Sequence, residues 1–231
     1  MDVNHYLEKR LAFIRRFYEL ARPSFEANAK LADQNWAHWQ HGLTDEEAEL
    51  NPDPPVELQD QCEEAHALCA LLGYTCLGSL QQTLKECLEA IVLRSGRTRQ
   101  FENKLSERKL SKLQGGWLER YRTIFKEFGC DWERGPAGFS DLEEIVLAWN
   151  AAKHEGSIAS LGRWQDLGYA RKFPMSRYLD EGDRFMDDRP ATEHVHHQNP
   201  KRVVVTQENF LFALETVDKF VRWVEADTRR W

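Results

Sequence analysis

The sequence predicts an all-α protein folded as an up-and-down bundle of about five or six helices. Three segments predict this fold, because their apolar residues recur at intervals of three and four, the spacing of one face of an α-helix. These segments cover residues 3–31, 56–93 and 207–231. A capping motif at Ser140 predicts a fourth helix. A chain of 231 residues can bury most of its apolar surface in one core, so we expect a single domain over residues 1–231.

The first helical pattern contains a proline. Pro23 lies within residues 3–31, and a proline inside a helix costs about 3 kcal/mol, so we expect a kink or a break into two helices there. Residues 35–55 are polar and acidic and end in the proline-rich run from Asn51 to Pro55. We therefore expect residues 35–55 to be a linker between helices.

Residues 56–93 carry the strongest pattern in the chain. Apolar residues surround the middle of this predicted helix on nearly all sides, which is typical of the central helix of a bundle. Gly73 and Gly78 are expected to loosen or kink it, at a cost of about 1 kcal/mol each. Ser95 and Gly96 end it. A further helix is predicted over residues 106–128, with a weak point at residues 115–116.

Two more helices are predicted in the second half of the chain. Ser140 and Glu143 match the capping box, and Gly156 is expected to end the helix that they begin. Residues 157–205 show little periodicity and are expected to form an irregular insertion, with a short extended piece at residues 203–205. Thr206 is a favourable cap for the C-terminal helix.

Composition narrows the class of protein. The formal net charge of -7 argues against a protein that coats nucleic acid through bulk attraction. Residues 1–10 lack the apolar run of a secretory signal, and no uncharged apolar run reaches the about 18 residues of a transmembrane helix. We therefore expect a cytoplasmic protein with no membrane contact. The cysteines are odd in number and four lie in one predicted helix, so we expect reduced thiols at Cys62, Cys69, Cys76, Cys87 and Cys130.

Residues 94–112 form the one clearly basic stretch. Two interpretations are open: a solvated loop and helix face, which is typical of short charge runs, or a local contact with RNA. The basic residues of this stretch are Arg94, Arg97, Arg99, Lys104, Arg108, Lys109 and Lys112.

Residues 143–158 carry the motif with the most chemical content. Asn150 and His154 lie one helical turn apart, and Gly156 follows. This segment resembles the motif of the HEPN superfamily, in which Arg is followed five positions later by His near a helix end, often with Asn after the Arg and Gly after the His. Trp149 stands at the position of that Arg. A long central helix before the motif and an irregular stretch and closing helix after it also resemble HEPN-like proteins, over about two thirds of the chain.

The resemblance implies a HEPN-like bundle and a metal-independent RNA-cleaving site without a cofactor. His154 would be the general base for a ribose 2′-hydroxyl, because histidine accepts protons near neutral pH. Asn150 would orient that ring or contact the phosphate. HEPN-like proteins pair two such helices across a dimer, so a homodimer is expected. Because Trp149 carries no charge, positive charge for RNA binding would come from Lys153, Arg94, Arg97, Arg99 and Arg163.

Three functions follow from these observations. The first is a HEPN-like protein of a toxin or defence system that acts as a non-catalytic or weakened ribonuclease-derived interaction module, binding RNA or a partner protein. The second is an active endoribonuclease that uses His154. The third is a helical scaffold subunit unrelated to RNA, in which Asn150 and His154 cap and pack a helix end.

Two clusters have metal-ligating residue types, but we expect no metal site. Residues 193–197 include three histidines, with Asp187 and Asp188 upstream, and their spacing matches no closed zinc site. Cys62, His66 and Cys69 share one face of the central helix, where small apolar core thiols are the expected interpretation.

Overall fold

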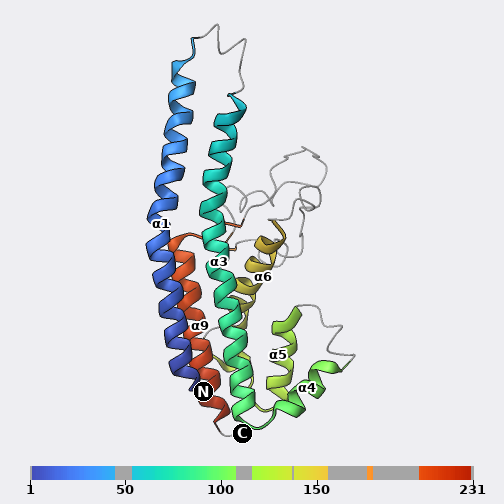
Figure 1. Ribbon diagram of the computed structural model, residues 1–231. Helices are drawn as coiled ribbons and strands as arrows, with labels where there is room; N and C mark the ends of the chain where they lie inside the picture. The colour runs from blue at the N-terminus through green and yellow to red at the C-terminus, as the bar shows by residue number, and fades with distance from the viewer. Residues whose placement is uncertain are drawn as a thin grey trace.

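The computed structural model describes residues 2–44, 54–107, 116–136, 138–155, 176–178 and 203–229, with the backbone alone for residues 151–155. Within these residues the protein is an all-α bundle of six helices, as the sequence predicts, and it contains no strand (Figure 1). None of the described helices combines the length and the apolar character that crossing a bilayer requires.

Two long helices, α1 (Val3–Gly42) and α3 (Val56–Arg94), run antiparallel and side by side. The predicted break at Pro23 does not occur, because α1 passes through Pro23 without interruption. The linker prediction was also wrong for residues 35–42, which continue α1. Both segments of α1 are held by packing, since Ile14 and Tyr18 before the proline, and Ala29 after it, are buried. This packing offsets the hydrogen bond that Pro23 cannot donate.

The central helix α3 has the predicted bounds within one residue and is likewise unbroken. Its two glycines do not interrupt it; they let neighbours approach closely. A Cβ atom at Gly73 would lie 2.5 Å from Cβ of Val205, and one at Gly78 would lie 2.9 Å from the Trp149 ring. These positions are therefore contacts between elements, which local helix propensity cannot reveal.

The basic stretch contains a helix that the sequence did not predict, α4 (Thr98–Ser106). Its one buried side chain, Phe101, meets the ring of Tyr121 edge to face at 4.9 Å. The predicted helix over residues 106–128 was wrong at its start, because Ser106 ends α4 and Glu107 is extended. The described part of that prediction is α5 (Gly116–Glu127), which follows residues outside the description.

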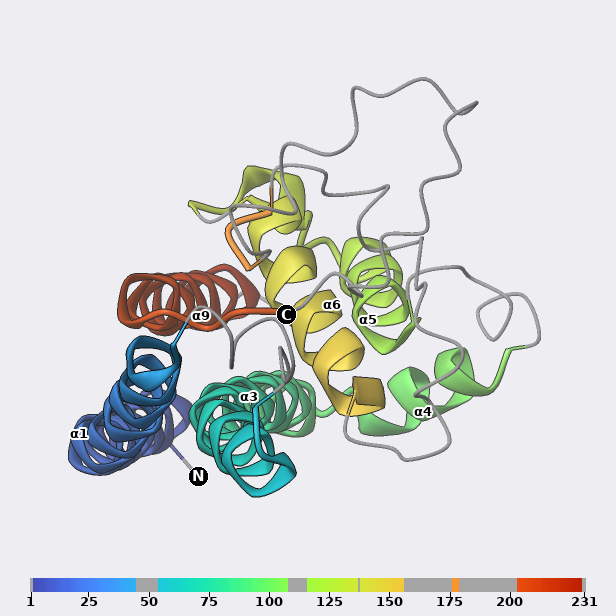
Figure 2. The ribbon, with the colours of Figure 1, turned by 90° about the horizontal axis from the view of Figure 1, so that it is seen from above.

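A short 3-10 helix, η2 (Trp132–Arg134), precedes α6 (Phe139–Glu155). Ser140 is the second residue of α6 and so is not its cap, and the helix begins two residues earlier than the capping box predicts. The Thr206 cap is confirmed: its side chain accepts a hydrogen bond from the Asn209 amide at the start of α9 (Gln207–Thr228). Figure 2 shows α9 and α6 on the same side of the α1–α3 pair.

Candidate functional site

The predicted catalytic pair lies near the C-terminal end of α6. Asn150 and His154 are one turn apart in this helix, which ends at Glu155, and Asn150 is half-buried. The side chains of Lys153 and His154 lie outside the described residues, as do Gly156 and Arg163. The helical placement of the pair therefore agrees with the sequence.

Trp149 occupies the position at which the HEPN motif has Arg, and it is a packing residue. Its half-buried indole packs against the main hydrophobic core. The end of the ring lies over Gly78 of α3, so close that a Cβ atom there would be 2.9 Å away. The position that would supply a guanidinium instead fixes α6 against α3. Without a partner such as Glu, a charged side chain in this contact would be costly.

Two of the predicted RNA-binding arginines have partners within the protein. Arg94, the last residue of α3, donates to Oε1 of Glu225 at 2.6 Å, and the Glu225 side chain is only 3 % exposed. Glu225 also accepts from Asn4 and lies 3.5 Å from the guanidinium of Arg229. This contact joins the end of α3 to α1 and α9.

The guanidinium of Arg97 lies over the Phe128 ring, 5.0 Å from its centroid, while Arg99 is exposed on α4. Arg94 follows Gly78 by sixteen residues in α3, which is about 24 Å along the helix. Since Trp149 lies at the level of Gly78, the structure does not bring Arg94 to the Asn150 and His154 end of α6. The basic stretch and the motif are separate features of the surface.

In the face formed by Cys62, His66 and Cys69, two of the three side chains have hydrogen-bond or ion-pair partners in α1. His66 Nε2 pairs with Oδ1 of Asp33 at 2.8 Å, and the Cys62 thiol donates to the carbonyl of Ala32 at 3.3 Å. Among the described residues no group of three potential ligands is placed to hold a metal ion. The histidines of residues 193–197, with Asp187 and Asp188, lie outside the description.

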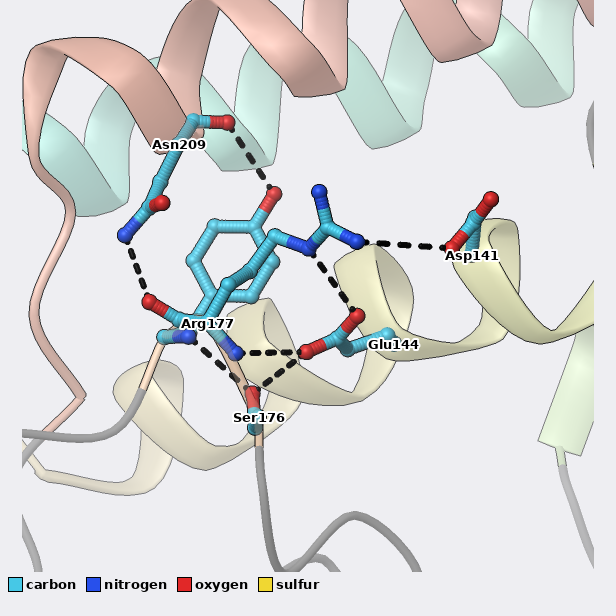
Figure 3. A network of polar contacts seen from close by, with 6 residues as sticks. Asp141, Glu144, Ser176, Arg177 and Asn209 are labelled. Carbon is cyan, nitrogen blue, oxygen red and sulfur yellow. Dashed lines mark hydrogen bonds and ion pairs between the residues drawn. The ribbon is translucent and has the colours of Figure 1, made fainter. Parts of the chain in front are cut away.

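A polar cluster that the sequence did not predict lies between α6 and α9 (Figure 3). Glu144 is at its centre, with a side chain 8 % exposed. Its Oε1 accepts from the Ser176 hydroxyl at 2.6 Å and from the Arg177 amide at 2.9 Å. Its Oε2 accepts from Nε of Arg177 at 3.3 Å. Both oxygens of this carboxylate are therefore occupied by donors from one short segment.

The same segment is tied to α9. The Asn209 side chain donates to the Arg177 carbonyl at 2.5 Å, and the Tyr178 hydroxyl donates to the Asn209 carbonyl at 3.2 Å (Figure 3). The Arg177 guanidinium lies 3.4 Å from the centroid of the Phe212 ring. The Arg177 amide and guanidinium donate to the Glu144 carboxylate of α6, and Asn209 of α9 holds the same segment. The cluster therefore fixes residues 176–178 between the two helices. Glu144 and Ser176 are 32 positions apart, and no local pattern in the sequence links them.

Comparison of the chain with protein-family models, with curated proteins and with solved structures gives no match.

Proposed function

We propose that this protein is a HEPN-like helical interaction module of a toxin or defence system, without ribonuclease activity. The observation that carries the proposal is the contact between Trp149 and Gly78, where a core indole stands in place of the motif's guanidinium. The HEPN-like fold, the toxin or defence setting and a cytoplasmic location rest on the resemblance of residues 143–158 and on the composition.

The chemistry of RNA cleavage supports the loss of activity. Without a metal, the phosphate that becomes pentacoordinate needs a positive group beside it, and removing one such stabiliser commonly costs on the order of 10²–10³ in rate. Trp149 carries no charge. Arg94 is engaged by the buried Glu225, and Arg97 stacks on Phe128. The two arginines are therefore engaged within the fold, and Arg94 lies at a distance from the motif.

The competing function is an endoribonuclease in which His154 is the general base. One feature favours it: His154 lies in the last turn of α6 and Asn150 lies one turn earlier, which is the helical spacing that the motif requires. Lys153 or Arg163 would then supply the positive charge. Substitution of His154 therefore distinguishes the two functions.

The test is to incubate the purified full chain with single-stranded and hairpin RNA, both with a chelator and with added Mg²⁺ or Mn²⁺. We expect no cleavage above the buffer control, and the same result for His154→Ala. Cleavage by the wild type that is lost in a folded His154→Ala variant would establish the endoribonuclease and overturn the proposal. Circular dichroism of both proteins shows that a loss of cleavage is not a loss of fold.

A further inference from the structure

One side of the α1–α3 pair carries no other described helix. In Figure 2, α9 and α6 lie on the opposite side of the pair. On α1, the side chain of Arg22 donates to Gln207 of α9, so Arg22 marks the side that faces α9. Leu31 follows Arg22 by nine residues, which is two and a half turns, and so lies on the opposite side of the helix. We call this side, with its α1 and α3 residues, the outer face.

The outer face of α1 carries four large apolar side chains that are exposed to solvent. Phe13, Phe17 and Leu20 precede Leu31 by eighteen, fourteen and eleven residues, which are close to whole numbers of turns, so all four share one stripe. Their exposed fractions are 63 %, 43 %, 69 % and 55 %, respectively. A row of large exposed apolar side chains on one side of a helix favours a protein–protein contact there.

A groove between α1 and α3 continues the outer face toward the free end of the hairpin. The residues that line it include the buried Ala32 and Ala65 and the less buried Leu31 and Leu68. The buried core behind it is made of small residues, Ala29, Ala32 and Ala65. This end of the hairpin extends beyond α9 in Figure 1, so α9 does not cover it. Two helices with an alanine core bury little apolar surface, and a second layer would stabilise them.

Basic and acidic residues are concentrated in different segments of the α1–α3 pair. Within residues 3–22 of α1, Lys9, Arg10 and Arg16 lie within about 60° of Leu31 around the helix and so on the outer face, whereas Arg15 and Arg22 lie on the other side. Residues 56–72 of α3 contain Glu57, Asp60, Glu63 and Glu64 and no lysine or arginine. Because the helices are antiparallel, the basic and acidic segments lie at opposite ends of the pair. Nucleic acid binds through basic residues that neutralise its phosphates, and the acidic segment of α3 would repel it, whereas this arrangement matches an inverted copy of itself.

We propose that the outer face binds the outer face of a second copy of this chain, with the two hairpins antiparallel across a twofold axis. The inference rests on the proposed function, for which it names the partner. This dimer differs from the pairing of motif helices that the HEPN resemblance implies, because α6 lies on the opposite side of the α1–α3 pair. We place the axis at the level of Ser24, midway between Phe17 and Leu31. Phe13 and Phe17 of one copy then lie against the groove of the other.

The same register places opposite charges together. Lys9 and Arg16 of each copy come to the levels of residues 39 and 32 of the other α1. Within one chain the Cys62 thiol contacts Ala32, so residues 39 and 32 lie near the levels of Glu57 and Glu64 of α3. The face is about 60 Å long, from forty residues in α1, and about 20 Å wide. A face of this size has room for the about 800 Å² per partner that a stable interface buries.

The first experiment is sedimentation equilibrium of the full chain at micromolar concentrations. We expect a dimer, and we expect Leu20→Glu to weaken association by on the order of tenfold or more, since it buries a charge in the apolar stripe. Val56→Glu is the matched control. Val56 is 68 % exposed, close to the 69 % of Leu20, but it lies five residues before Gln61 of the groove, about 140° around α3. That variant should associate like the wild type.

Charge reversal tests the antiparallel register. Arg16→Glu and Glu64→Lys should each weaken the dimer, and the double variant should regain most of the lost affinity. The four positions substituted in the two experiments are all exposed, so we expect the variants to fold, and circular dichroism checks this. They are Arg16, Leu20, Val56 and Glu64. A monomeric wild type would overturn the proposal and leave the face to a different chain. A dimer unaffected by Leu20→Glu and by the reversals would also overturn it. RNA cleavage by an intact dimer would overturn the proposed function alone.

Discussion

Trp149 on α6 and Gly78 on α3 fit each other: a Cβ atom at Gly78 would lie 2.9 Å from two atoms of the indole ring. This contact explains two features at once. Glycine is unfavourable inside a helix, but at position 78 a larger residue would collide with the indole ring. Trp149 in turn has a structural role at the position where a HEPN ribonuclease has its positively charged Arg. The stability of the bundle should therefore depend on Gly78.

Gly78→Ala should lower the free energy of unfolding by about 1–3 kcal/mol, because the methyl group overpacks a rigid ring and outweighs the gain in helix propensity. Urea unfolding followed by circular dichroism measures it. Gly42→Ala is the control, since no described atom lies within 4 Å of a Cβ atom at this last residue of α1. A Gly78→Ala variant as stable as the Gly42→Ala variant would contradict the close packing.

Arg94→Ala should lower stability by about 1–3 kcal/mol, because it removes a charged hydrogen bond from the buried Glu225 carboxylate. Arg99→Ala changes the same kind of residue in the same basic stretch, but at an exposed position of α4, and should leave the unfolding midpoint unchanged. Thermal unfolding of both variants compares them. Equal midpoints for the two variants would show that the Arg94–Glu225 pair contributes nothing to the fold.

Glu144→Ala should release residues 176–178 from α6. The change leaves the donors of Ser176 and Arg177 without their carboxylate, at a cost of about 2–3 kcal/mol. Amide hydrogen exchange at Val204 reports on it directly, because this amide donates to the Tyr178 carbonyl at 2.7 Å. We expect faster exchange there. Glu215→Ala, at a surface carboxylate paired with Lys219, is the control and should leave that amide protected.

Alkaline pH should destabilise the protein through its buried thiols. Burial raises the pKa of Cys87 from 9.0 to about 12 and that of Cys76 to about 11. The unfolded chain therefore loses these protons first, and stability present below pH 9 falls as the pH rises toward 11 and 12. Each group contributes about 1.4 kcal/mol per pH unit in this window.

Urea unfolding at a series of pH values from 8 upward measures the decline. Cys87→Ala is expected to be less stable at pH 8, because it leaves a small cavity, but to lose less stability between pH 9 and 11 than the wild type. An identical slope in both proteins would exclude the Cys87 thiol as a source of the alkaline loss.

Local sequence patterns were sufficient for much of the helical framework. The bounds of α3 and the cap of α9 were predicted because apolar periodicity and a side-chain cap act within a few residues of each other. The same local rules were wrong at Pro23 and missed α4. In both places contacts with another helix decided the outcome: α1 packs along α3, and Phe101 packs on Tyr121.

The candidate site shows the same division. The sequence placed Asn150 and His154 one turn apart on a helix, since their spacing is itself a helical turn. It gave no sign that Trp149 would meet Gly78, because 71 residues separate them, nor that Glu144 would hold Ser176.

By itself, then, the sequence determined the all-α class, the central helix and the helical spacing of the motif, all of which depend on interactions between near neighbours in the chain. Only the tertiary structure decided what those residues contact: an indole over Gly78, an arginine held by Glu225, and an apolar stripe beside a groove on the outer face. Such contacts join residues that are distant in the chain, and their free energy depends on how the helices pack.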